Sequence, residues 1–186
     1  MIGTADDFDR EQKEILEEVR EIRDRYRGQG MAWNRFRGIA TLNVVKRCLK
    51  KHMPKSKRVV KLGWVEGCPM EFDLIIVRRD AKPIGLTPAY GRNDVFCTVE
   101  VKSAGVFWKL DEMGEELKKL RQKAMETQKP WLYLTLWESE KRADITTNVL
   151  GQDAFIMRIG TGRREQFREG QWRGFVDRIN RELQAS

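Results

Sequence analysis

A continuous apolar run in the middle of the chain, Leu74-Ile75-Ile76-Val77, restricts the fold more than any other feature. The run is the centre of residues 71–79, and a short apolar segment of this kind is typical of a buried β-strand. Residues 58–65 before it and 94–103 after it are also strand-like. Residues 80–93 hold two prolines and two glycines, which indicate a loop. The middle of the chain is therefore expected to form a sheet.

Helical periodicity stands on both sides of these strands. Apolar residues recur at the spacing of an α-helix in four segments: residues 6–27, 34–52, 110–127 and 170–183. Residues 131–137 and 154–159 predict two further strands, with a polar connection between them. Helices and strands in this order predict an α/β fold, with a central mixed β-sheet flanked by helices on both faces.

The positive charge of the chain is concentrated in one segment. The net charge is +8, yet residues 1–27 contain nine acids against six bases. Residues 33–65 contain ten bases and no acid. Such a surface suits a polyanion, because each neutralised phosphate releases condensed counterions. We expect double-stranded DNA as the partner, contacted by basic residues of this segment: Arg35, Arg37, Lys46, Lys50, Lys51, Lys55 and Lys57.

The N-terminal segment is set apart by its charge and by glycines at positions 28 and 30. Residues 1–30 are interpreted as an amphipathic helix with a linker, and residues 31–186 as the main domain. The apolar seam of this helix is Ile15, Val19, Ile22 and Tyr26, too short for a stable coiled coil by itself. The helix must dock on its own domain or on a second copy. A homodimer is favoured, because a two-fold pair supplies one site for each strand of a duplex.

The composition also argues against other classes of protein. No apolar run approaches the roughly 18 residues of a membrane span, and the start is acidic rather than signal-like, so we expect a cytoplasmic protein. Cys48, Cys68 and Cys97 have no metal-ligand spacing and are expected to be reduced. His52 is the only histidine, which gives little support to a Ser-His or Cys-His hydrolase or to a zinc site.

Two of the expected strands carry charged residues that a sheet does not easily accommodate. Glu100 and Lys102 project from one face of their strand, because side chains alternate. Asp73 directly precedes the apolar run of the preceding strand. An antiparallel hairpin through residues 80–93 would bring Asp73 across from Glu100. Two carboxylates and one ammonium group would then share a small volume.

This set of groups suits the hydrolysis of phosphodiester bonds. Two carboxylates hold a hard cation such as Mg²⁺ (or Mn²⁺) through oxygen ligands. The cation stabilises charge on the phosphate and lowers the pKa of a bound water. A lysine beside that water orients it or takes its proton.

The sequence at this point resembles the PD-(D/E)xK nuclease superfamily. Asp73 is followed 27 positions later by Glu100-Val101-Lys102, within a similar order of helices and strands from residue 33 to 137. The resemblance implies a restriction endonuclease-like three-layer fold and a Mg²⁺-dependent DNA endonuclease acting in restriction, repair or junction processing. Asp73 and Glu100 would hold the metal, and Lys102 would be the catalytic lysine. Gln122 falls where members often carry a polar residue facing the site.

The sequence departs from that pattern in two places. The proline that usually precedes the first aspartate is absent, and residues 34–52 lack the glutamate that many members carry in this helix. Glu71 shares a strand face with Asp73 and is our candidate for a third metal ligand, with Glu17 and Glu21 as weaker ones. Two alternatives remain open. One is an inactive nuclease-fold module that binds DNA or a partner nuclease, and the other is a buried ion pair without metal.

Overall fold

The computed structural model describes residues 3–26, 31–104, 109–160 and 164–185. The α-helices are α1 (Ala5–Arg25), α2 (Met31–Lys51), α3 (Met113–Met125), α4 (Glu140–Leu150) and α5 (Gln171–Gln184). The strands are β1 (Lys57–Val65), β2 (Glu71–Arg78), β3 (Ala89–Tyr90), β4 (Val95–Lys102), β5 (Trp131–Thr135), β6 (Ala154–Ile156), β7 (Arg158–Ile159) and β8 (Gln166–Phe167). The proposed linker at residues 28–30 lies outside the described residues.

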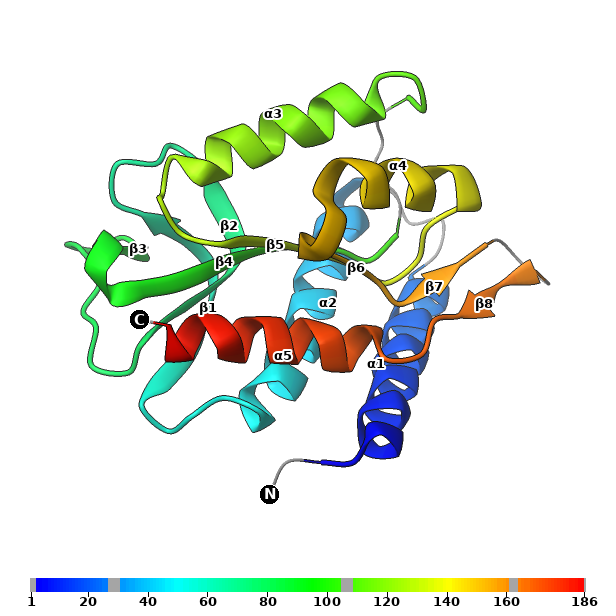
Figure 1. The fold of residues 1–186 in the computed structure, drawn as a ribbon, viewed down its shortest axis with the longest axis horizontal. Coiled ribbons are helices and arrows are strands. Elements are labelled where there is room, and N and C mark those ends of the chain that lie inside the picture. Colours follow the sequence, from blue (N-terminus) through cyan, green and yellow to red (C-terminus); the bar gives the residue numbers. More distant parts are fainter. Residues whose placement is uncertain (1–2, 27–30, 105–108, 161–163, 186) are drawn as a thin grey trace.

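The main sheet is mixed, as predicted. Its six strands follow the order β3-β1-β2-β4-β5-β6. β2 is antiparallel to both β1 and β4, whereas β4, β5 and β6 run parallel to one another. α3 connects β4 to β5, and α4 connects β5 to β6 (Figure 1). The carboxyl ends of β4 and β5 therefore lie at the same edge of the sheet.

Helices cover both faces of the sheet, which gives the fold its three layers. On one face α1, α2 and α5 share a core with the strands, built around Leu74, Val99 and Leu134. On the other face α3 and α4 pack over a second core that includes Ile75, Val77 and Tyr133. Neighbouring residues of β2 thus enter opposite cores, as the alternation of side chains along a strand requires. The predicted α/β fold class is confirmed.

The predicted elements differ from the structure mainly in the last third of the chain. The segment expected to be a polar connection between two strands contains α4. The predicted strand 154–159 is divided into β6 and β7, and β7 pairs with β8 in a separate two-stranded sheet. The predicted loop 80–93 contains the short strand β3, which runs parallel to β1. None of the helices that the structure describes is long and apolar enough to cross a membrane.

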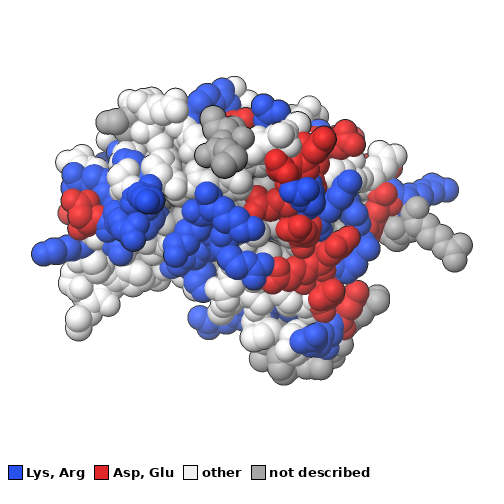
Figure 2. All heavy atoms as spheres, turned by 90° about the horizontal axis from the view of Figure 1, so that it is seen from below, with Lys and Arg blue, Asp and Glu red and all other residues white. Residues whose placement is uncertain are grey.

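Charged side chains are segregated on the surface. Figure 2 shows a face on which Lys and Arg gather beside a band of Asp and Glu. α1 supplies several exposed acids: Asp6, Glu14, Glu17, Glu21 and Asp24. Exposed bases of α2 include Arg35, Arg47, Lys50 and Lys51. The acidic helix and the basic helix pack against each other.

The apolar seam of α1 is buried against its own domain. Ile15, Leu16 and Val19 are at most 1% exposed and belong to the core that α2 and α5 share. In the structure, α1 packs against its own domain, which is one of the two arrangements that the sequence left open. Ile22 and Tyr26, the other two residues of the seam, are half-buried, so little of the seam is left for a second copy, and the homodimer stays a prediction.

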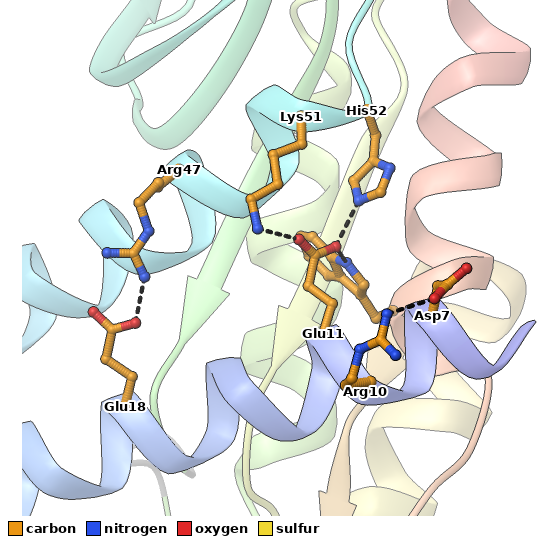
Figure 3. A network of polar contacts seen from close by, with 8 residues as sticks. Asp7, Arg10, Glu11, Glu18, Arg47, Lys51 and His52 are labelled. Carbon is orange, nitrogen blue, oxygen red and sulfur yellow. Dashed lines mark hydrogen bonds and ion pairs between the residues drawn. The ribbon is translucent and has the colours of Figure 1, made fainter. Parts of the chain in front are cut away.

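Polar contacts fix α1 in this position. Glu11 accepts hydrogen bonds from Lys51 Nζ at 2.9 Å and from the indole N–H of Trp172 at 2.7 Å, and it pairs with His52 Nε2 at 2.5 Å. Figure 3 shows Lys51, at the end of α2, and His52, which follows it, reaching Glu11, and Arg47 reaching Glu18 further along α1. Burial acts to raise the pKa of Glu11, but the hydrogen bonds from His52, Lys51 and Trp172 outweigh it and lower the pKa to about 2. The N-terminal helix is thereby joined to both α2 and α5.

Candidate active site

The regular pairing of β2 and β4 stops just before Asp73. Continuing the register by one residue places Asp73 opposite Glu100. At this point the acceptor of the inter-strand hydrogen bond is a side chain instead of a main-chain carbonyl. Asp73 Oδ2 accepts a hydrogen bond from the N–H of Val101 at 2.8 Å. On the other side of β2, the register places Leu62 opposite Asp73, and Leu62 has a φ of 50°. Positive φ is uncommon for residues other than glycine, so the sheet is distorted on both sides of Asp73.

Lys102 joins the two carboxylates. Its Nζ donates a hydrogen bond to Glu100 Oε1 and lies 4.0 Å from Asp73 Oδ2. Glu100 is buried, and Lys102 and Asp73 are half-buried. The predicted antiparallel arrangement is confirmed, as is the prediction that two carboxylates and one ammonium group share a small volume.

The three groups perturb one another electrostatically. Burial and the neighbouring Asp73 carboxylate raise the pKa of Glu100 to about 7, although Lys102 opposes the shift. Burial also raises the pKa of Asp73, against the opposing influence of Lys102 and the Val101 N–H. For Lys102, burial acts to lower the pKa, but the two carboxylates outweigh it and the pKa is raised. Lys102 is therefore an ammonium group at neutral pH, shared between carboxylates that burial makes reluctant to ionise.

A cavity of about 320 Å³ opens beside these residues. Asp73, Glu100 and Glu71 line it from β2 and β4, and Leu62 lines it from β1. The N-terminal half of α2 forms the remaining wall, which includes Arg35. The site is thus open to a ligand on the side where one base of the basic segment stands.

The donor set of this cavity fits a hard divalent cation only in part. Asp73 and Glu100 offer carboxylate oxygens, which Mg²⁺ and Mn²⁺ prefer, and they lie close enough to repel each other. A cation between them would compensate the charge that burial now disfavours. Glu71 is exposed and lines the same cavity. Within the described residues, however, no group of three His, Cys, Asp or Glu side chains is arranged to hold a metal ion.

Gln122 does not belong to this group of residues. α3 turns Met113, Leu117 and Ala124 toward the sheet, where they are fully buried. Gln122 is exposed, and its position in the helical repeat places it away from that face. The expectation that Gln122 faces the site is therefore not met.

The basic residues expected to contact DNA fall into separate environments. Lys51 pairs with Glu11 of α1, and Lys57 lies 3.3 Å from the centre of the Phe96 ring. Arg37 bonds to the nearby Asn34. Within the described residues, the other four bases have no contact of these kinds. Arg35 lines the cavity, Lys50 and Lys55 are exposed, and Lys46 is half-buried.

Three polar residues beside the site were not identified from the sequence. The parallel pairing of β4 and β5 places Tyr133 next to Glu100 and Thr135 next to Lys102. Glu138 follows β5 and is 2% exposed, and burial raises its pKa to about 7. Thr135 Oγ1 lies 3.5 Å from Glu138 Oε1. The alternation within residues 131–137 suggests which of these side chains share a face, but the register against β4 is not readable from sequence.

No protein-family model matches the sequence, and no curated protein matches it either. The fold does have counterparts among solved structures. It is a three-layer α/β fold, with a mixed six-stranded sheet between two helical layers.

Solved structures similar to this chain include two of NucC in its cAAA-bound form. For NucC of E. coli MS115-1 the TM-score is 0.62 at 14% sequence identity, covering 100% of this chain and 92% of that chain. For NucC of P. aeruginosa ATCC27853 the TM-score is 0.63 at 13% identity, with the same coverage. At such low identity the similarity establishes the fold alone.

Proposed function

We propose that this chain is a Mg²⁺-dependent endonuclease that hydrolyses phosphodiester bonds in double-stranded DNA. The observation that carries the proposal is the contact of Lys102 with both Asp73 and Glu100, where the sheet opens into a cavity. The fold shared with the NucC structures supports it, because it is the fold that the PD-(D/E)xK resemblance implies.

Asp73 and Glu100 would hold the divalent cation, and Glu71 is the third candidate from the same cavity. A bound Mg²⁺ or Mn²⁺ would supply charge stabilisation at the phosphate and activation of a water. Lys102 would supply the positive charge and the hydrogen-bond donor of the site. Against the effect of burial, the two carboxylates raise its pKa, so the amine that pairs with them is protonated and donates hydrogen bonds. It orients the attacking water and offsets the negative charge that develops on the phosphate.

Arg35 is placed to hold the substrate. It lines the same cavity as both carboxylates, so a phosphate beside Asp73 and Glu100 is also near a guanidinium. Guanidinium groups bind phosphate through paired hydrogen bonds. The positive charge of α2 would then attract the backbone, while the carboxylates act at the scissile bond.

A second candidate function is a nuclease-fold module that binds DNA without cutting it. The observation in its favour is that the described residues offer two converging carboxylates and no cluster of three. Cleavage separates the two candidates, since both require DNA binding.

The test is the nicking of supercoiled plasmid in Mg²⁺ and in EDTA. The proposal predicts nicking in Mg²⁺ alone, and its loss in Glu100→Gln and in Lys102→Ala. Glu115→Gln, at an exposed position of α3, is the matched control and should cut normally. Nicking that persists in EDTA or in Glu100→Gln contradicts the proposed site. A folded wild-type protein that binds DNA and never cuts it supports the binding module instead.

A further inference from the structure

The two sides of α2 have different electrostatic partners. Arg47 and Lys51 face α1, where they pair with Glu18 and Glu11 (Figure 3). Lys46 lies on another side of the helix, close to Lys61 of β1. The bases on the first side of α2 are therefore paired with acids of α1, whereas Lys46 on the second side faces another lysine.

Lys46, Lys50 and Lys61 form what we call the basic cluster. Burial lowers the pKa of Lys46, and repulsion from Lys61, Lys50 and Arg58 lowers it further. Lys61 Nζ donates to the neutral side chain of Asn43. Within the described part of the chain, no ion pair joins Lys46, Lys50 or Lys61 to an acid. Like charges are thus held together without a compensating carboxylate.

This arrangement contrasts with that of two lysines on α3. Lys118 and Lys119 of α3 each pair with a glutamate one turn away, as solvated helix charges commonly do. Crowded and uncompensated lysines raise the energy of the free protein and strengthen its attraction for a polyanion. The basic cluster is therefore suited to binding phosphates.

The basic cluster is aligned with the cavity of the candidate active site. Arg35, Ile39 and Leu42 line that cavity from one stripe of α2. Lys46 and Lys50 continue the stripe, at positions four and eight residues after Leu42. At 1.5 Å of helix rise per residue, they lie about 6 and about 12 Å along the axis beyond Leu42, and Lys61 directly precedes the cavity residue Leu62 in β1.

We propose that the basic cluster binds the DNA backbone next to the cleavage point, on one side of it. The proposal rests on the proposed function, since it takes the cavity as the position of the scissile phosphate. Duplex DNA rises about 3.4 Å per base pair, so a distance of about 6 to 12 Å corresponds to about two to four base pairs. The cluster thus sets a minimum length of duplex on that flank.

The first experiment measures DNA binding without cleavage, by fluorescence anisotropy in EDTA at a series of salt concentrations. The variant carries Lys46→Gln, Lys50→Gln and Lys61→Gln together. The matched control removes the same charge from α3, with Lys118→Gln, Lys119→Gln and Lys123→Gln. Each phosphate contact contributes about 0.9 to the slope of log affinity against log salt, so the variant's slope should fall by about two to three. The control's slope should stay at the wild-type value.

The second experiment shortens the duplex from one end at a time. Wild-type affinity should fall at least ten-fold when one flank drops below about two base pairs, and the cluster variant should not respond to that truncation. Equal slopes for the two triple variants, or a length dependence that the cluster variant retains, would overturn the proposal. Lys50→Gln alone, at an exposed position, provides the same comparison with a slope change of about one if the triple variant does not fold.

These outcomes are independent of catalysis. If plasmid is never nicked, the slopes and the length dependence still decide whether the cluster binds DNA. If cleavage occurs but the cluster variant binds like wild type, the active site stands and the cluster proposal fails.

Discussion

The carboxylate of Asp73 accepts the N–H of Val101 at 2.8 Å, across the point where two antiparallel strands stop pairing. The side chain therefore has a structural role, as a substitute for a main-chain acceptor, beside its proposed role as a metal ligand. Two substitutions separate the roles. Asp73→Asn keeps an acceptor for Val101 but removes the charge, whereas Asp73→Ala removes both.

We predict that the free energy of unfolding of Asp73→Asn equals or exceeds that of the wild type, because the substitution removes a negative charge that burial disfavours. We also predict that this variant does not cut DNA. Asp73→Ala should lose about 1–3 kcal/mol, because the buried N–H of Val101 is left without its acceptor. Urea denaturation of both variants measures the difference. Equal stability of the two variants would show that the hydrogen bond to Val101 contributes nothing.

Lys102 should stabilise the fold in a pH-dependent way. Lys102→Met leaves Asp73 and Glu100 facing each other without a cation, which we expect to cost about 2–3 kcal/mol while both are ionised. Burial already raises the pKa of Glu100 to about 7. The deficit should therefore be largest above pH 7 and should shrink as the pH falls and Glu100 is protonated. Thermal unfolding between pH 5 and 8.5 measures this, and a pH-independent deficit would contradict it.

Tyr133 offers a test of the polar groups beside the site. Among the described residues its hydroxyl is buried without a hydrogen-bond partner, and burial raises its pKa above the usual value. Tyr133→Phe should therefore leave stability unchanged or increase it by about 1–2 kcal/mol. Tyr90→Phe is the matched control. The hydroxyl of Tyr90 accepts a hydrogen bond from Arg58 at 3.3 Å, so its removal should lower stability. Chemical denaturation compares them, and a large loss in Tyr133→Phe would mean that its hydroxyl is bonded in solution.

Docking of α1 should weaken at low pH. Because the folded pKa of Glu11 is about 2, below its usual value of 4.5, its stabilising effect is complete above about pH 4.5. It should be lost as the pH falls toward 2, and it amounts to at most about 3 kcal/mol. Glu11→Gln should lower stability at pH 7 and flatten the acid limb, whereas Glu18→Gln, in an exposed pair, should change stability by less than about 1 kcal/mol. Identical acid limbs for wild type and Glu11→Gln would refute this role.

The core of the site was predictable because its information is local. Glu100 and Lys102 share a face by strand alternation, and Asp73 reaches them through one hairpin-like connection. Tyr133 and Glu138 were not predictable in the same way. The place of Tyr133 next to Glu100 depends on the parallel register of β4 and β5, and Glu138 lies beyond the end of β5, so no local pattern gives either position.

The missed elements have a similar cause. α4 contains Thr146, Thr147 and Val149, which are weak helix formers, and only Ala143, Thr146 and Leu150 are buried. Such a helix is stabilised by its contacts with α3 and β6 more than by its own propensity. The partner of Lys51 was likewise hidden, because Glu11 lies 40 positions away in the sequence.

The most direct test of the central claim is a crystal structure of the protein soaked in Mn²⁺, with anomalous data collected at the manganese edge. The account predicts a manganese peak within about 2.5 Å of carboxylate oxygens of both Asp73 and Glu100, with Lys102 released from its hydrogen bond to Glu100. An intact Lys102–Glu100 pair, with no peak at a Mn²⁺ concentration that supports cleavage, would contradict it.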